Sequence, residues 1–302
     1  MRENSIVRWL ERFPQIASEH LVLGIGDDAA TLHLGDTQDL TVVTTDLIAD
    51  GSHFRSEDHS AAQIGRKAMA VNLSDIAAMA ASPVAAFVSL LLPVQCSETY
   101  VQELMSSAIE LANSFGCTVA GGDTNVWNGP LAVNVLIIGR TTGKAPLQRS
   151  GAKPNDRLMV TGELGGSIHG HQFEFIPRIQ EALWLHTNFE IDACMDLSDG
   201  LALDLQRLCS ASGCGAEIRA DWLPVSSRVT GRGEAAIHAA LGDGEDFELL
   251  LAASPDESER VLQSTARKFD IHVIGTCTKD KGIWLSDANG RRPMPQLGFE
   301  HH

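Results

Sequence analysis

The chain has 302 residues, of which 44% are apolar and 21% are charged, and its formal net charge at pH 7 is −16. This length allows two domains that each bury a core, and the composition is that of a globular protein. The acidic balance argues against nucleic acid or an anionic membrane as a partner, because both are bound through clusters of Lys and Arg. An anionic substrate would need metal ions between itself and this protein.

The sequence contains no pattern that marks the chain for export or for a membrane. An amphipathic helix around Trp9 and Leu10 is expected to end at Pro14. The longest apolar run, residues 84–94, is too short to span a bilayer. The six cysteines form no CxxC pair and no zinc spacing with histidine, so we expect small buried thiols and a cytoplasmic protein.

The first motif lies in residues 21–34, LVLGIGDDAATLHL, which predict a strand, a Gly-rich turn with Asp27 and Asp28, and a second strand. Gly24, Gly26 and Ala29 also match the dinucleotide fingerprint GxGxxA. We reject that interpretation, because two carboxylates occupy the phosphate position and a strand follows where a helix is needed. Either aspartate could serve the turn alone, or both could hold a metal.

Residues 40–45, LTVVTT, predict a central strand that ends at Asp46, and strand ends are common places for ligand-binding groups. His53 follows in a loop. Two interpretations of it are open, a ligand and an ordinary loop residue. Residues 65–83 then predict a helix that is apolar nearly all round and yet carries Asn72 and Asp75 on one face. A carboxylate there needs a cation or several donors, and a structural Arg is the alternative partner.

Residues 84–94 predict a buried strand, and Ser97 is expected to cap a helix that reaches Phe115 and ends at Gly116. A short strand ending at Asp123 and a strand over 131–139 follow. Residues 140–156 are rich in Gly, Pro and basic residues, which is typical of a connection between domains. We expect domains at 1–141 and 142–302. The basic residues of the connection are either a solvated face or phosphate contacts; they are Lys144, Arg149 and Lys153.

The second half predicts mixed α and β structure. Residues 157–161 are strand-like, and the sequence GGSIHG is expected to open a helix. Asp196, Ser198 and Asp199 precede a helix expected to start near Ser198, and capping that helix explains one of the three but not all. Glu245 and Asp246 lie in a Gly-flanked loop before a strand, and an amphipathic helix covers 255–269.

Five acidic sites thus lie at turns and strand ends without a basic neighbour in sequence. If they converge, each pair of charges repels by about 4 kcal/mol at roughly 4 Å and an effective dielectric near 20. Such a cluster needs bound cations. Oxygen-only ligands favour Mg²⁺, which shares its coordination with substrate phosphates, so the pattern indicates phosphate-ester or nucleotide chemistry. The chain lacks the P-loop, protein-kinase, HExxH and GxSxG motifs.

In this order, GIGDDAA, TTD with GSHF, KAMAVNLSDIAAMAASP, GGDT, RSGAKPND, DLSDGLALDL and GEDFELL resemble the motifs of thiamine-monophosphate kinases over nearly the whole chain. That family belongs to the superfamily of aminoimidazole ribonucleotide synthetase. The resemblance implies an α/β (α+β) fold of two domains: an N-terminal mixed sheet with helices that dimerises and a C-terminal α/β domain of the synthetase type. It also implies ATP as co-substrate and several Mg²⁺ ions.

The same resemblance implies roles for individual residues. The implied metal ligands are Asp28, Thr44, Thr45, Asp46, Asp75, Asp123, Asp196 and Asp199. The implied ATP contacts are Gly122, Asp123, Arg149 and Ser198, and the implied contacts to thiamine monophosphate are His53, Glu245 and Phe299. Three departures from the family pattern stand out. The family's AAMGA is AAMAA here, its GGED is DGED at Asp243 to Asp246, and the stretch between Gly170 and Asp192 is shorter than expected.

The reaction implied is phosphoryl transfer from ATP to the phosphate of thiamine monophosphate, giving thiamine diphosphate. The attacking phosphate oxygen is already mostly ionised, since its second pKa is about 6, so no protein base or nucleophile is expected. Other members of the superfamily are rivals, although selenophosphate synthetases carry a reactive Cys near the N-terminus and the first Cys here is Cys96. A non-catalytic protein that binds Mg-nucleotide is the rival of another class.

Overall fold

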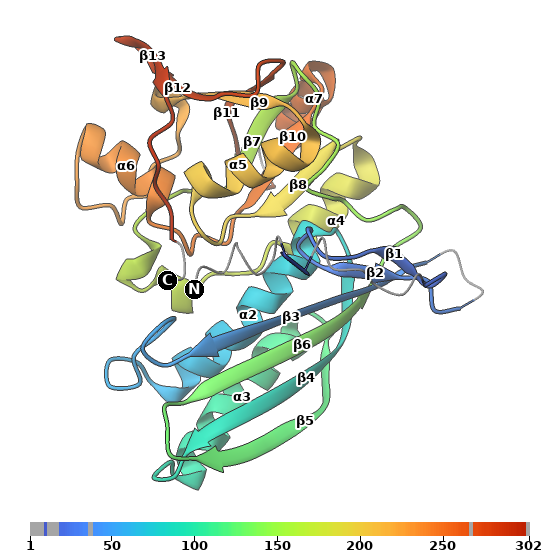
Figure 1. The fold of residues 1–302 in the computed structure, drawn as a ribbon, viewed down its shortest axis with the longest axis vertical. Helices are drawn as coiled ribbons and strands as arrows, with labels where there is room; N and C mark the ends of the chain where they lie inside the picture. The colour runs from blue at the N-terminus through green and yellow to red at the C-terminus, as the bar shows by residue number, and fades with distance from the viewer. Residues whose placement is uncertain (1–8, 11–17, 36–38, 266–267, 300–302) are drawn as a thin grey trace.

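The computed structural model describes residues 9–10, 18–35, 39–265 and 268–299, which form two sheets with helices packed on them (Figure 1). The predicted first helix lies outside the described residues except for Trp9 and Leu10, and so do His301 and His302. Within the described ranges, no helix is long and apolar enough to cross a membrane.

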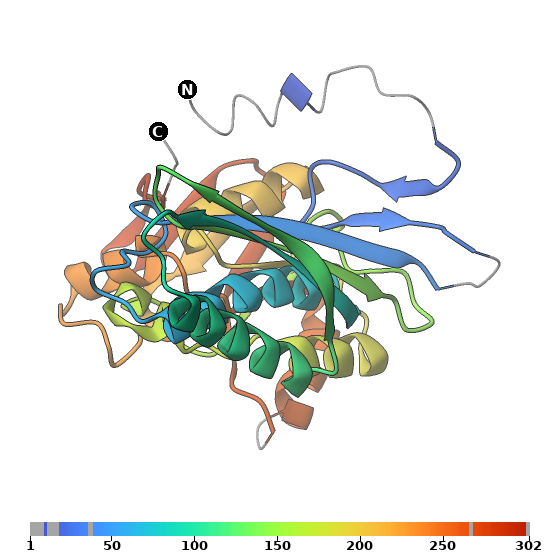
Figure 2. The ribbon, with the colours of Figure 1, turned by 90° about the horizontal axis from the view of Figure 1, so that it is seen from below.

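The first sheet has six strands in the order β1-β2-β3-β6-β4-β5, with β4 and β5 parallel and the other pairs antiparallel. Its strands are β1 (Leu21–Leu23), β2 (Ala30–Leu32), β3 (Thr41–Ala49), β4 (Ser82–Pro93), β5 (Thr118–Trp127) and β6 (Ala132–Arg140). Two helices, α2 (Ala61–Ala78) and α3 (Glu98–Ser114), cover one face of this sheet (Figure 2). Within residues 39–265 no helix covers the other face, which is called the open face below. The predicted strand, turn and strand around Asp27 is confirmed, and no helix follows Gly26.

Two strands are longer than predicted. β3 continues past Asp46 to Ala49, and β5 continues past Asp123 to Trp127. The reason is tertiary pairing: Ala49 lies opposite Ala132 of β6, and Trp127 opposite Pro93 of β4. Both aspartates therefore lie inside strands and not at their ends.

The buried helix α2 is confirmed, and its start is fixed by a capping box in which Ser60 accepts from the backbone N–H of Gln63. Gly65 lets α3 approach closely, because a Cβ there would stand 2.0 Å from the carbonyl oxygen of Leu104. Ser97 caps α3 as predicted, accepting from the N–H of Tyr100 at 3.2 Å. The helix ends with Phe115 as its cap, and Gly116 follows with φ +71°.

The second sheet has seven strands in the order β13-β12-β9-β11-β7-β10-β8, with β9 and β12 parallel. Its strands are β7 (Arg157–Thr161), β8 (Ala193–Asp196), β9 (Gly215–Arg219), β10 (Leu249–Ala253), β11 (Ile271–Thr278), β12 (Ile283–Asp287) and β13 (Gly290–Pro293). Its α-helices are α4 (Ile179–Asn188), α5 (Leu201–Ser212), α6 (Glu234–Gly242) and α7 (Pro255–Thr265), and its 3-10 turns are η1 (Ser167–His169), η2 (His171–Phe173) and η3 (Ala220–Trp222).

Two helix predictions in this half are wrong. GGSIHG opens only the short turns η1 and η2, because Gly166 and Gly170 adopt positive φ (75° and 120°) and interrupt any regular helix. Helix α5 begins at Leu201 and not near Ser198, since Gly200 has a positive φ of 106° with ψ 145°, which lies outside the helical region. The loop before α5 is held by Asp204, whose carboxylate accepts from the N–H groups of Asp199 and Gly200.

Helix α2 lies between the two sheets (Figure 1). One hydrophobic core contains its apolar residues together with Met159 of β7, Cys194 of β8 and Leu249 of β10. A second core fills the other face of the seven-stranded sheet, beneath α5. The helix that carries Asp75 is therefore packed against both halves of the chain.

Candidate active site

Three carboxylates meet where the two halves join. Asp28 comes from the β1–β2 turn, Asp75 from α2 and Asp196 from the end of β8, and one oxygen from each lies within 4.8 Å of the others. Asp28 and Asp196 are buried. At an effective dielectric near 20, each pair of charges at this separation repels by about 3 kcal/mol. The predicted convergence is therefore observed for these three positions.

Neutral hydrogen-bond donors hold this cluster. Thr44 Oγ1 donates to Asp75, and Ser74 Oγ donates to Asp196 Oδ2 at 2.6 Å. Burial is the main cause that raises the pKa of Asp75 well above its usual range, and the charges of Asp46, Asp196 and Asp28 add to it. Burial and then Asp28 likewise raise the pKa of Asp196. When these carboxylates are ionised together, the two neutral hydroxyl donors do not balance their charge. The cluster then needs a cation.

Arg149 supplies one positive charge, and it pairs with Asp28 and not with Asp75. Its Nε and Nη2 both donate to Asp28 Oδ1, at 3.0 and 2.5 Å, while its backbone N–H donates to Asp27. Although burial opposes the charged form, Asp28 raises the pKa of Arg149 above its ordinary value. Burial also raises the pKa of Asp27 to about 6. Asp28 has no basic neighbour in sequence, as noted above, and its cationic partner comes from 121 residues away.

The cluster fits a hard divalent cation. Asp28 Oδ2 is buried and has no hydrogen-bond partner among the described residues, which is a costly state for a carboxylate oxygen. The three grouped ligand atoms are all carboxylate oxygens, and such sets suit Mg²⁺ better than zinc or copper. Asp46, whose charge acts on Asp75, is held through its backbone N–H, which donates to Asn72 Oδ1 at 2.9 Å.

Thr45 and Asp123 lie on the open face of the sheet and not in this cluster. Asp123 stands in register with Ser89, and Ser89 with Asn134, so their side chains share one face. Asn134 Nδ2 donates to Thr45 Oγ1 on that face. Asp123 is exposed there and accepts from Asn125 at 2.8 Å.

Gly122, the neighbour of Asp123, permits a close backbone approach. Its φ is +155°, and a Cβ at this position would stand 1.7 Å from the carbonyl oxygen of Val88 in β4. Only glycine fits there without displacing one of the two parallel strands.

The loop between β8 and α5 gathers four other predicted residues. Asp199 pairs with Arg207 at 2.6 Å, a second ion pair that the sequence reading missed. The carbonyl of Ser198 accepts from the N–H of Glu245 at 2.7 Å, and the carbonyl of Asp199 accepts from the N–H of Phe299 at 3.0 Å. The structure thus ties two predicted substrate contacts, Glu245 and Phe299, to the DLSDG motif.

The third predicted substrate contact, His53, lies beside a residue that the sequence reading overlooked. Lys67 of α2 is buried, and its ammonium donates to the carbonyl of His53 and pairs with Glu245. A lysine inside a helix that is apolar nearly all round was the available signal. The remaining basic residues of the connection, Lys144 and Lys153, pair with Glu190 and Asp192.

Asp246, next to Glu245, is buried and accepts from Ser167 Oγ at 2.5 Å and from the N–H of Gly165 at 3.0 Å. Burial raises its pKa from 3.8 to about 7. Its contribution to stability is complete below pH 4. Between pH 4 and 7 this contribution is lost, because the unfolded chain releases the proton that the folded chain still holds.

We therefore expect Asp246→Asn to become more stable relative to the unchanged protein as the pH rises from 5 to 7. The free energy of unfolding should shift by at most about 1.4 kcal/mol per pH unit. Urea unfolding of both proteins in EDTA at pH 5, 6 and 7 measures the difference. A difference that stays constant with pH would contradict the assignment.

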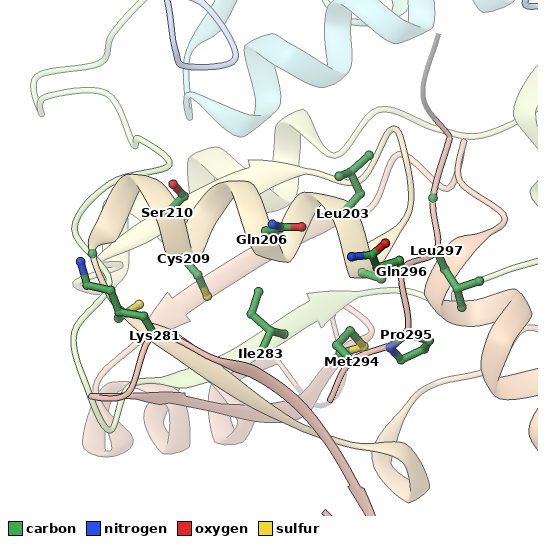
Figure 3. A pocket seen from close by; sticks show the side chains of 14 residues that line it. Leu203, Gln206, Cys209, Ser210, Lys281, Ile283, Met294, Pro295, Gln296 and Leu297 are labelled. Atoms are coloured by element: carbon green, nitrogen blue, oxygen red, sulfur yellow. The ribbon is translucent and has the colours of Figure 1, made fainter. Parts of the chain in front are cut away.

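A cavity of about 820 Å³ lies away from the carboxylates, between α5 and residues 294–298 (Figure 3). Its lining includes Gln206, Cys209, Lys281 and Met294, and no carboxylate. None of the predicted site residues lines it, so the acidic chemistry belongs to the junction of the two halves.

Comparison with known proteins gives concordant matches over both halves. The family model for the N-terminal domain of AIR synthase related proteins matches residues 26–141, and that for their C-terminal domain matches residues 176–286. The thiamine-monophosphate kinase of Rhodopirellula baltica is 38% identical over 302 residues, covering 96% of this chain and 93% of that protein. The structure of AaThiL complexed with AMPPCP and TMP has a TM-score of 0.81 at 26% identity and covers 99% of this chain and 95% of its own. The thiamine-monophosphate kinase of Stenotrophomonas maltophilia K279a has a TM-score of 0.75 at 30% identity, covering 93% and 95%.

Proposed function

This chain belongs to the AIR synthase related proteins and, among them, to the thiamine-monophosphate kinases, and we propose that its acidic cluster is the place where the phosphoryl group is transferred. The protein is a phosphotransferase that uses ATP to phosphorylate thiamine monophosphate. The observation that carries the proposal for the site is the meeting of Asp28, Asp75 and Asp196, which come from three separate parts of the chain.

The chain's own residues supply positioning and charge, not a proton acceptor. Thiamine monophosphate, which accepts the phosphoryl group, is a phosphate monoester whose second pKa is about 6. At pH 7 its oxygen therefore attacks the γ-phosphorus of ATP without a protein base. The bond from that phosphorus to the β–γ bridging oxygen breaks, giving thiamine diphosphate and ADP. Orientation and stabilisation of negative charge are then the catalytic work.

Magnesium is part of the proposal. Asp28, Asp46, Asp75 and Asp196 would hold Mg²⁺ ions, with Thr44 hydrogen-bonded beside them and Asp199 as a further ligand. When bound, Mg²⁺ neutralises the charge of the phosphate oxygens and of the carboxylates. The orphaned Asp28 oxygen and the raised pKa of Asp75 support this assignment. On the open face, Thr45 and Asp123 are proposed to hold a separate ion.

Separate sets of residues are proposed to bind the nucleotide and thiamine monophosphate. ATP would be held by Gly122, Asp123, Arg149 and Ser198. Thiamine monophosphate would be held by His53, Glu245 and Phe299. Backbone bonds from Glu245 to Ser198 and from Phe299 to Asp199 support placing the acceptor next to the nucleotide motif. AMPPCP, the ligand of AaThiL, is an analogue of ATP, which supports the same pairing of substrates here.

We further propose a homodimer that buries the open face of the first sheet. That face carries large exposed side chains, including Leu47 and Phe87, which are 56% and 38% exposed. Exposed apolar patches of this kind mark protein interfaces. Sedimentation equilibrium should give twice the chain mass of 32.4 kDa, and a species of 32.4 kDa at micromolar concentration would contradict the dimer.

The division of the chain and its location are also proposals. The irregular segment between β6 and β7 supports a domain boundary after residue 141. A cytoplasmic location is proposed from the six free cysteines, five of them buried.

The test of the function is a phosphorus NMR assay with thiamine monophosphate, ATP and Mg²⁺. We expect thiamine diphosphate and ADP in equal amounts, and neither product with EDTA. Intact ATP in the presence of Mg²⁺ would contradict the kinase activity. Turnover that persists in EDTA would contradict the magnesium site alone.

A further inference from the structure

Lys67 is the most deeply buried charged side chain near the proposed acceptor site. It lies on α2 with 0% exposure, and burial lowers its pKa from the ordinary value of 10.5. A buried ammonium is retained only when its three protons find acceptors. Its surroundings therefore show what it holds in place.

Three acceptors take those three protons, and they come from both halves of the chain. The carbonyl oxygen of His53 lies 2.7 Å from Nζ, and Oε1 of Gln172 lies 2.5 Å away. The third acceptor is the carboxylate of Glu245. The ring of Phe173 covers the ammonium, with its centroid 5.1 Å away. With all protons used and no exposed surface, Lys67 is not a contact to substrate.

Two of these three partners are proposed acceptor contacts. The imidazole of His53 is itself oriented, because its Nδ1 accepts from the N–H of Ala49 at 3.1 Å. Glu245 belongs to a loop with left-handed backbone at two residues that are not glycine, with φ 58° at Glu245 and φ 50° at Phe247. Such backbone persists only where its surroundings determine it.

We infer that Lys67 is a positioning residue that holds His53 and Glu245 together across the junction of the two halves, so that thiamine monophosphate meets both at once. This inference rests on the proposed acceptor site. It adds a residue to which neither the family resemblance nor the sequence pattern gave a role. Loss of the ammonium removes the hydrogen bond to the His53 carbonyl and the ion pair with Glu245, the two contacts that join these residues through one group.

The test is Lys67→Met, with separate KM values for the two substrates. We expect the KM for thiamine monophosphate to rise by about tenfold or more, since small misplacements of binding groups have large effects. The KM for ATP should stay within about twofold, because the carboxylate cluster does not contact Lys67. If Lys67→Met does not fold, Lys67→Gln carries the same expectation.

Arg66→Met is the matched control. Arg66 also crosses the junction, donating to the carbonyls of Phe173 at 3.2 Å and Phe175 at 2.6 Å, and neither of these bonds goes to His53 or Glu245. It should lower Tm without raising the KM for thiamine monophosphate. An equal rise in that KM for Arg66→Met would mean that both residues only hold the two halves of the chain together. It would overturn the inference.

Glu245→Gln separates this inference from the proposed site. If Glu245→Gln raises the KM for thiamine monophosphate and Lys67→Met does not, the positioning role is wrong and the site stands. If Glu245→Gln has no effect, the proposed acceptor site fails, and the role of Lys67 fails with it. Where both single variants have effects, the double variant should show less than their product, because both act through one contact.

Discussion

Asp75→Asn is expected to lower kcat by at least about a thousandfold while the fold survives. The amide has nearly the same shape as the carboxylate and still accepts from Thr44 Oγ1. It removes, however, one of the three charges whose oxygens lie within 4.8 Å of one another, and with it an anionic ligand for the proposed Mg²⁺. The chemistry depends on that charge, and the packing of α2 does not.

The same variant should be at least as stable as the unchanged protein when metal is absent. The raised pKa of Asp75 means that its ionised form is unfavourable in the folded state, so its contribution to stability is lost as the pH rises through that pKa. Asn cannot ionise, and above neutral pH its Tm in EDTA should equal or exceed that of the unchanged protein. Added Mg²⁺ should raise the Tm of the unchanged protein more than that of the variant.

Activity and calorimetry with and without Mg²⁺ measure both effects. Asp221→Asn is the control, because Asp221 is exposed and pairs with Arg219 at the surface in η3. It should keep its activity and its response to Mg²⁺. An active Asp75→Asn would show that the buried cluster is not where the metal acts.

Arg149→Leu is expected to have the second largest effect, a loss of about 3–5 kcal/mol of stability in the absence of metal. Arg149 forms an ion pair with Asp28, whose side chain is fully buried, and removal of the guanidinium leaves that carboxylate facing Asp75 and Asp196. Turnover should also fall, with a KM for ATP raised by about tenfold if the guanidinium binds the nucleotide.

Magnesium distinguishes an electrostatic effect from a packing effect in this variant. A cation bound at the cluster supplies the charge that Arg149 no longer provides, so saturating Mg²⁺ should reduce the loss of stability. Arg149→Lys keeps the charge but not the planar group that places two N–H donors on one oxygen. Its free energy of unfolding should therefore lie between those of Arg149→Leu and the unchanged protein. Urea unfolding with EDTA and with Mg²⁺ measures both variants, and a loss that Mg²⁺ leaves unchanged would contradict this account.

Local sequence was sufficient for most elements of the fold. The apolar surroundings of Asn72 and Asp75 predicted the buried α2, and Ser97 marked the start of α3. The β-branched run before Asp46 predicted β3. These features depend on side chains a few residues apart, whose periodicity and capping are visible in the chain itself. The predictions that failed, at GGSIHG and at Ser198, were decided by glycines whose φ depends on what packs around them.

The chemistry of the site was also visible in the sequence, as a set of aspartates in unusual places. Its arrangement was not. Asp28 and Arg149 meet because the β1–β2 turn lies against the connection between the sheets, and Lys67 meets Glu245 because α2 is packed between both halves. The face that Asp123 occupies follows from its register with Ser89 in β4. Sequence determined which side chains were available, whereas contacts over more than a hundred residues required the register of two sheets and the packing of one helix between them.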